Sequence, residues 1–341
     1  MKKFLILSLF FATLAFAANP KVVGYFPSWA QYSGFTSADV RYSFLSDVRY
    51  CCVVPSGSEL LFTEESDKAN FAELVRLSKA NKVRIFVSIG GMGNESSIAD
   101  VSAQNLTRAV KSFAKEYKVN GFEIDGGEIN ANGVRNVASL ASALADAGIL
   151  VSVAIPGEAS LSNAISIDVA RKLDAISLWF TDQMGTKERA VKPNSNTTQN
   201  IKVLAAFASA GIPKEKLFAI VPFYGKSFDG ASSLGSSFSG TGSGNDGVLQ
   251  YKDLMDKFSN ANAYKVSLDN ASQSEIAVNA REIIVFNGIP SMQAMAGAIK
   301  DNGYGGIAVF DISGDHKEPT VSLLVTIGQI LRPEVNYKKK K

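Results

Sequence analysis

The 341-residue chain has a formal net charge of +3, two cysteines and a single histidine, His316. Catalytic Ser-His-Asp hydrolysis and multi-histidine metal sites would have to use that one residue, and no nucleophile elbow, H-E-x-x-H or cysteine-rich metal motif surrounds it. We therefore expect carboxylates as the reactive groups and no metal or organic cofactor. Six lysines lie at the two termini, and without them the charge is about −3, which does not suggest a nucleic-acid partner.

The first 17 residues have the pattern of a cleavable Sec signal peptide. Lys2 and Lys3 precede an apolar run over 4–14, and Ala15-Phe16-Ala17 is a small-residue cleavage site. No later apolar stretch reaches the roughly 18 residues that a membrane span needs. We therefore predict a secreted protein, extracellular or periplasmic, whose residues 334–341 form a basic disordered tail.

Short apolar, β-branched runs alternate along the chain with amphipathic segments of helical spacing, a pattern typical of parallel strands joined by helices. The helical segments are 71–80, 99–117, 134–147, 198–210 and 292–302. The eight strand-like runs are 22–26, 48–54, 83–89, 121–125, 149–155, 175–179, 217–221 and 306–310. Eight such units predict a (β/α)8 barrel over residues 18–333, with its active site at the carboxyl ends of the strands. A doubly wound sheet is the alternative, although no glycine-rich dinucleotide fingerprint follows the first strand.

The connection between the seventh and eighth strands is long and begins with a stretch rich in glycine and serine. We predict a small α/β insertion over about 228–285. The adjacent Cys51 and Cys52 lie in the second strand, and because a bridge between neighbours is strained we predict two buried thiols there.

Three carboxylates gather at the end of the fourth strand, in the sequence NGFEIDGGE at 120–128. Side chains alternate faces along a strand, so Glu123 and Asp125 share a face and Glu128 is one residue out of phase. A regular strand would aim Glu128 away from the other two, unless the Gly126-Gly127 pair forms a bulge that redirects it. Glu128 is then either a directed acid or a solvated loop carboxylate, and Glu123 either couples to Asp125 or makes a structural hydrogen bond.

In their order and spacing, four segments resemble glycoside hydrolase family 18, the chitinase-like barrels. They are VVGYFPSW at 22–29, SIGG at 88–91, PFYG at 222–225, and Ser291 followed by GGIAVF at 305–310 and SGD at 313–315. The resemblance implies a (β/α)8 barrel that hydrolyses chitin-like glycans containing N-acetylglucosamine. It also implies substrate-assisted retention, in which the acetamido oxygen attacks the anomeric carbon, a glutamate is the general acid and an aspartate supports the N-acetyl group.

The family motif on the fourth strand is D-G-x-D-x-D-x-E, and this chain departs from it. Mapped without gaps, Asp125 is retained and Gly127 takes the place of the acid, whereas one inserted residue gives that role to Glu128. Thr181 stands where the family usually has a tyrosine, and Phe310 stands where it has a tryptophan. The candidate catalytic residues are Glu128, Asp125 and Glu123. The candidate substrate-binding residues are Phe26, Asp182, Tyr224 and Phe310.

Three functions follow as hypotheses. The first is a secreted glycosidase of the chitinase or endo-N-acetylglucosaminidase type. The alternative is a catalytically inactive, chitinase-like carbohydrate-binding protein, and an interaction or inhibitor protein on the same barrel is a third possibility. We expect a monomer whose partner is an oligo- or polysaccharide.

Overall fold

The computed structural model describes residues 19–91, 93, 95–183, 189–259 and 263–335. The predicted signal peptide and nearly all of the predicted tail lie outside these ranges. Within them, no helix is long and apolar enough to cross a membrane.

Eight parallel strands close into a barrel. Each pairs in parallel with its neighbours in the order β1-β2-β4-β5-β6-β7-β8-β15, and β15 pairs with β1 to complete the ring. The predicted (β/α)8 barrel is confirmed, and the doubly wound alternative is wrong because its sheet would keep two open edges. The strands are β1 (Lys21–Pro27), β2 (Asp47–Ser56), β4 (Arg84–Gly90), β5 (Gly121–Asp125), β6 (Val151–Pro156), β7 (Ile176–Trp179), β8 (Leu217–Pro222) and β15 (Gly306–Phe310).

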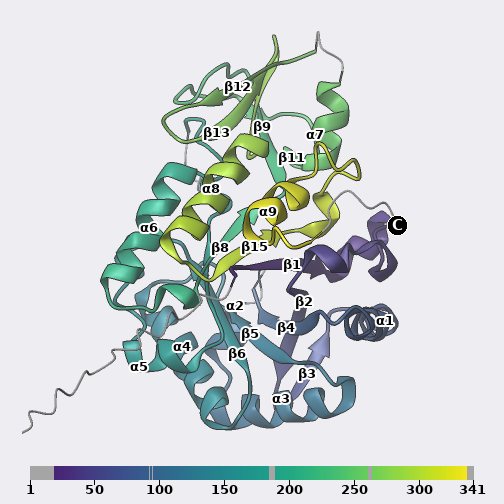
Figure 1. Ribbon diagram of the computed structural model, residues 1–341, viewed down its shortest axis with the longest axis vertical. Coiled ribbons are helices and arrows are strands. Elements are labelled where there is room, and N and C mark those ends of the chain that lie inside the picture. The colour runs from purple at the N-terminus through teal and green to yellow at the C-terminus, as the bar shows by residue number, and fades with distance from the viewer. Residues whose placement is uncertain (1–18, 92, 94, 184–188, 260–262, 336–341) are drawn as a thin grey trace, which may run out of the picture.

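Helices surround this ring and cover its outer face (Figure 1). They are α1 (Asp67–Ala80), α2 (Glu95–Ala99), α3 (Ala103–Tyr117), α4 (Ala131–Asp146), α5 (Ile167–Lys172), α6 (Thr197–Ser209), α8 (Ile289–Asn302) and α9 (Leu323–Leu331). Short 3-10 turns occupy Ser28–Ser33, Ser37–Asp39, Tyr42–Phe44, Ala159–Leu161, Lys214–Lys216 and Ile312–Gly314.

Local sequence explains where these helices begin and which face they bury. The side chains of Ser102 and Asn130 accept hydrogen bonds from backbone N–H groups in the first turns of α3 and α4, satisfying donors that a helix leaves free. Along α3 the buried positions Leu106, Val110 and Phe113 recur at helical spacing, so one stripe packs on the barrel.

A second, antiparallel sheet is inserted between β8 and β15, as predicted for the seventh and eighth barrel strands. It lies above the barrel in the view of Figure 1. Its elements are β9 (Tyr224–Asp229), β10 (Gly240–Thr241), β11 (Val248–Gln250), α7 (Tyr251–Phe258), β12 (Lys265–Asp269), β13 (Ser274–Val278) and β14 (Glu282–Phe286). A further strand, β3 (Glu59–Phe62), runs antiparallel to the end of β2.

The barrel has two apolar cores because its strand side chains alternate between faces. On β5, Phe122 and Ile124 join the large outer core beneath the helices, which leaves Glu123 and Asp125 on the inner face. The inner core is smaller and gathers mainly aromatic and small residues. The carboxyl end of this inner face, called the mouth below, is where strand-end side chains from several elements meet.

Candidate active site

Asp125 is the buried carboxylate of the mouth. It ends β5 with a side chain only 1% exposed, level with Gly90 of β4 and Ala154 of β6. Its Oδ1 accepts hydrogen bonds of 3.0 Å from Trp179 Nε1 and 3.0 Å from the Gly127 backbone N–H. Two such donors stabilise a carboxylate that burial alone would disfavour.

Gly91 lets this carboxylate occupy its position. A Cβ atom at Gly91 would collide with the carboxyl group of Asp125, and its φ of +66° lies in the left-handed region that favours glycine. Gly91, the last residue of the SIGG segment, thus leaves space for the Asp125 carboxylate of the neighbouring strand.

Glu128 lies in the loop that follows β5. The pairings of β5 with β4 and β6 run in regular register to Asp125, so Gly126 and Gly127 follow the strand and form no bulge within it. Gly127 has a φ of +58°, and the Glu128 side chain is exposed in the loop before α4. The chain therefore presents this third carboxylate from a loop to solvent.

Glu123 is completely buried and forms an ion pair with Arg49 inside the barrel. Its Oε1 accepts a 2.6 Å hydrogen bond from the Tyr25 hydroxyl and a 3.4 Å bond from Ser88 Oγ. We expected Glu123 either to couple to Asp125 or to make a structural hydrogen bond. The bonds from Tyr25 and Ser88 are of the second kind. Burial raises the pKa of Glu123 above its ordinary value, and the guanidinium and the two hydroxyl donors offset only part of that rise.

Three aromatic side chains cover the polar interior at the mouth. Tyr25 lies with ring centroids 5.7 Å from Trp179 and 5.6 Å from Phe310, and Trp179 lies 5.1 Å from Phe310. Trp29, which is 40% exposed, is next to Phe310 at 6.5 Å. Rings of this kind offer flat apolar faces to a ligand.

Phe26 does not belong to this group. It is fully buried in the outer core, where its ring packs against Tyr50 and Phe35. Its predicted contact with substrate does not fit this position, because strand alternation turns Tyr25 inward and its neighbour Phe26 toward the helices.

Asp182 and Tyr224 meet at the mouth, just beyond the ends of β7 and β8. The Tyr224 hydroxyl donates a hydrogen bond to Asp182, whose carboxylate also forms an ion pair with Lys226. Asp182 has a φ of +53°, and its backbone N–H donates to Asn194 Oδ1 at 3.2 Å. Burial, followed by the charge of Asp182, raises the pKa of Tyr224 well above its ordinary value, so this hydroxyl keeps its proton.

The two cysteines are not thiols. Cys51 and Cys52 form a disulfide bond, which corrects the prediction of two buried thiols. The pairing of β2 with β4 shifts register between Tyr50 and Val53, and both cysteines contribute to the inner core while Val53 lies in the outer one. This irregularity places two successive side chains on the same side, where their sulfur atoms can meet.

Sequence reasoning did not single out Arg49 and Lys226. Arg49 is a single charge inside an apolar strand run, and it shares a strand face with Cys51. A charge at such a position needs a buried partner, and this could have indicated its role. Lys226 lies on β9 and becomes a neighbour of Asp182 only through the fold.

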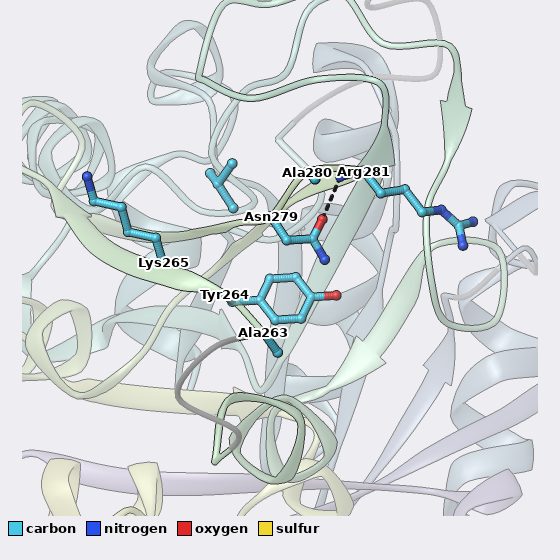
Figure 2. A pocket seen from close by; sticks show the side chains of 7 residues that line it. Ala263, Tyr264, Lys265, Asn279, Ala280 and Arg281 are labelled. Atoms are coloured by element: carbon cyan, nitrogen blue, oxygen red, sulfur yellow. Dashed lines mark hydrogen bonds between the residues drawn. The ribbon is translucent and has the colours of Figure 1, made fainter.

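No group of three or more His, Cys, Asp or Glu side chains suited to a metal ion occurs in the described part of the chain. A hollow on the insertion, lined by Tyr264, Lys265, Asn279 and Arg281 among others, shares no residue with the mouth (Figure 2).

Comparison with known proteins agrees with this geometry. Residues 21–315 match the family model for glycosyl hydrolases family 18. The chain is 23% identical to Chitinase A1 of Niallia circulans over 90% of this chain, but that match spans only 58% of the relative. The fold resembles the Group IV chitinase of Ostrinia furnacalis with a TM-score of 0.83 at 21% identity, covering 92% of this chain and 100% of the other. It also resembles YKL-39, solved in the presence of chitooligosaccharides, with a TM-score of 0.81 at 19% identity and coverage of 93% and 99%. With a family model matched over most of its length, the chain belongs to the glycosyl hydrolases of family 18.

Proposed function

We propose that this protein is a secreted glycoside hydrolase that acts on chitin-like glycans containing N-acetylglucosamine. The observation that carries the proposal is Asp125, a buried carboxylate held by Trp179 and Gly127 at the mouth of a family 18 barrel. Chitinases among the relatives support the substrate class. Export rests on the signal pattern of the first 17 residues.

In the proposed reaction Asp125 acts on the acetamido group at the reacting sugar. Its negative charge stabilises the positive charge that develops on the acetamido nitrogen as the acetamido oxygen attacks the anomeric carbon. The two hydrogen bonds to Oδ1 keep this carboxylate oriented while the charge builds.

Glu128 is the proposed general acid that protonates the leaving oxygen. An acid of this kind must hold its proton near neutral pH, which requires removal from water or a neighbouring negative charge. Glu128 is exposed, so the glycan itself has to cover it before it can act as that acid.

The test is release of a fluorescent aglycone from N,N′-diacetylchitobioside by the mature protein, from about pH 4 to pH 9. Replacing Glu128 by Gln should lower turnover by at least about a hundredfold. Glu116, an exposed glutamate on α3, supplies the matched control, and Glu116→Gln should leave turnover unchanged. Equal rates for wild type and Glu128→Gln would contradict the assigned acid.

A second function, glycan binding without hydrolysis, is favoured by one observation. Gly127 occupies the acid position in the ungapped motif, and the nearest following carboxylate, Glu128, lies in solvent. Calorimetry with N-acetylglucosamine oligomers separates the two functions. Binding with no turnover at any pH supports the binding protein, whereas absence of both contradicts both functions for this class of glycan.

A further inference from the structure

A buried polar layer lies inside the barrel immediately beneath the mouth. Arg49 and Glu123 are 2% and 0% exposed. Arg49 Nη1 donates to Glu123 Oε2, to the Tyr25 hydroxyl at 3.2 Å and to Ser177 Oγ at 2.8 Å. The guanidinium on β2 thereby joins side chains from β1, β5 and β7.

This layer contacts the residues that hold Asp125. Tyr25 donates to Glu123 through its hydroxyl and packs its ring against Trp179, and Trp179 donates to Asp125. The contacts run without a break from Arg49 to the carboxylate at the mouth. Displacing Arg49 would therefore disturb a site that it does not touch.

Charge gives the layer a second role. Glu123 and Asp125 are two residues apart on the inner face of β5, so the negative charge of each carboxylate disfavours ionisation of the other. Arg49 changes this balance because a guanidinium keeps its charge at any pH that the protein meets. If Glu123 took up a proton, Arg49 would become a buried cation without its counter-charge, which is strongly unfavourable.

The other charges near Arg49 are already paired. Asp47 and Asp174 bind Arg84, and Lys21 also pairs with Asp174, at the opposite end of the barrel. Glu123 is thus the carboxylate in contact with Arg49 in the described part of the interior.

We propose that Arg49 is a positioning residue that holds Glu123 as a carboxylate at neutral pH and, through Tyr25 and Trp179, keeps Asp125 oriented for a glycan at the mouth. The role of the glycan rests on the proposed function. The state of Glu123 does not, and the experiment keeps the two apart.

The direct test is carboxyl NMR of protein labelled with 13C at the glutamate side chains, with Glu123→Gln identifying the Glu123 signal. In the wild type this signal should lie at the carboxylate position at neutral pH, and in Arg49→Met it should show a protonated carboxyl at the same pH. A protonated Glu123 in the wild type at neutral pH overturns the proposal, as does an unchanged titration in Arg49→Met.

The double variant Arg49→Met with Glu123→Gln continues the test if the single variant does not fold, because it leaves no unpaired buried charge. It removes one positive and one negative charge, so the pH midpoint of glycan binding should stay within about 0.5 units of the wild type. If Glu123 were neutral in the wild type, the pair would lose a net positive charge, and the midpoint would rise. That rise would overturn the proposal.

Arg84→Met is the matched control, since it breaks an arginine–carboxylate pair at the other end of the same barrel. It should lower thermal stability and leave the Glu123 signal unchanged. If no glycan binds to any variant, the proposed function fails while the NMR titration still decides the role of Arg49.

Discussion

At the scale of single residues, neighbouring carboxylates of one short segment have different environments. Asp125 is buried and receives two hydrogen bonds, whereas Glu128 is exposed three residues later. The difference arises because the strand ends at Asp125 and Gly127 turns the chain with a positive φ. Whether the molecule hydrolyses its ligand depends on how a bound glycan changes the surroundings of Glu128.

The hydrogen bond from Trp179 to Asp125 should matter for ligand binding. Trp179→Phe keeps an aromatic ring and removes the Nε1 donor, so we expect glycan affinity to fall about tenfold, the usual cost of losing a hydrogen bond to a charged group. Calorimetry measures this loss. In an Asp125→Ala background the same change should have little further effect, and additive losses would contradict the coupling.

At the scale of elements, the end of β2 shows how an irregular strand alters chemistry. The register shift puts both cysteines in the inner core, beside Tyr25 and Phe310, and allows the bond between them. Disulfides of this kind persist in oxidising compartments, which agrees with the proposed export.

Alkylation followed by mass spectrometry tests this bond. Denatured protein treated with iodoacetamide should gain no alkyl group without reductant and two after reduction, because both cysteines are in the disulfide. Cys51→Ser leaves one thiol and should take one group without reduction. Two groups on unreduced wild-type protein would show that the thiols are free.

A carboxylate of the insertion caps a helix of the barrel. Glu275 of β13 accepts hydrogen bonds from the backbone N–H groups of Gly288, at 2.7 Å, and Ser291, at 3.2 Å, at the start of α8. Gly288 has no side chain to cap this helix, so a carboxylate from another element supplies the acceptor and complements the helix dipole.

Removing that acceptor should weaken the whole fold. Glu275→Ala leaves buried N–H donors without a partner, and we expect the free energy of unfolding to fall by about 1–3 kcal/mol in urea denaturation. Glu318→Ala, at an exposed site, should change it by less than about 0.5 kcal/mol. Equal losses for the two variants would argue against the capping role.

At the scale of the whole molecule, charges at the amino end of the barrel connect strands that are distant in sequence. Arg84 Nη2 binds Asp47 at 2.7 Å and Asp174 at 3.1 Å, and Lys21 reaches Asp174 at 3.4 Å. Burial by itself would raise the pKa of Asp174, but the hydrogen bonds and charge of Arg84, with Lys21, outweigh it and lower that pKa below its ordinary value.

The sign of this shift predicts a pH dependence. A carboxyl with a lowered pKa in the folded state adds stability above its unfolded value of about 3.8 and loses it as the pH falls through the folded value. Asp174→Asn should therefore reduce stability by about 1–3 kcal/mol at pH 7, and its deficit should shrink below about pH 4. Thermal or urea unfolding across pH measures both effects. Asp168→Asn, at a side chain that is 91% exposed, should show neither.

The sequence by itself determined the barrel fold, the family and the position of Asp125 at a strand end. Strand and helix signals are local periodicities, so eight runs alternating with helical segments were enough to predict a (β/α)8 fold, and the four matched segments were enough to indicate the family. The placement of Asp125 at a strand end followed from the same alternation.

The tertiary structure alone decided which of these residues meet and which face solvent. Arg49 pairs with a glutamate 74 positions away only because the barrel brings their strands together. Phe26 faces the helices because side chains alternate faces along β1. The register shift of β2 brings the two cysteines together. Such pairings depend on strand register and backbone direction, which many distant contacts fix together. The exposure of Glu128 has the same origin, since it depends on the turn that the chain makes after leaving the barrel.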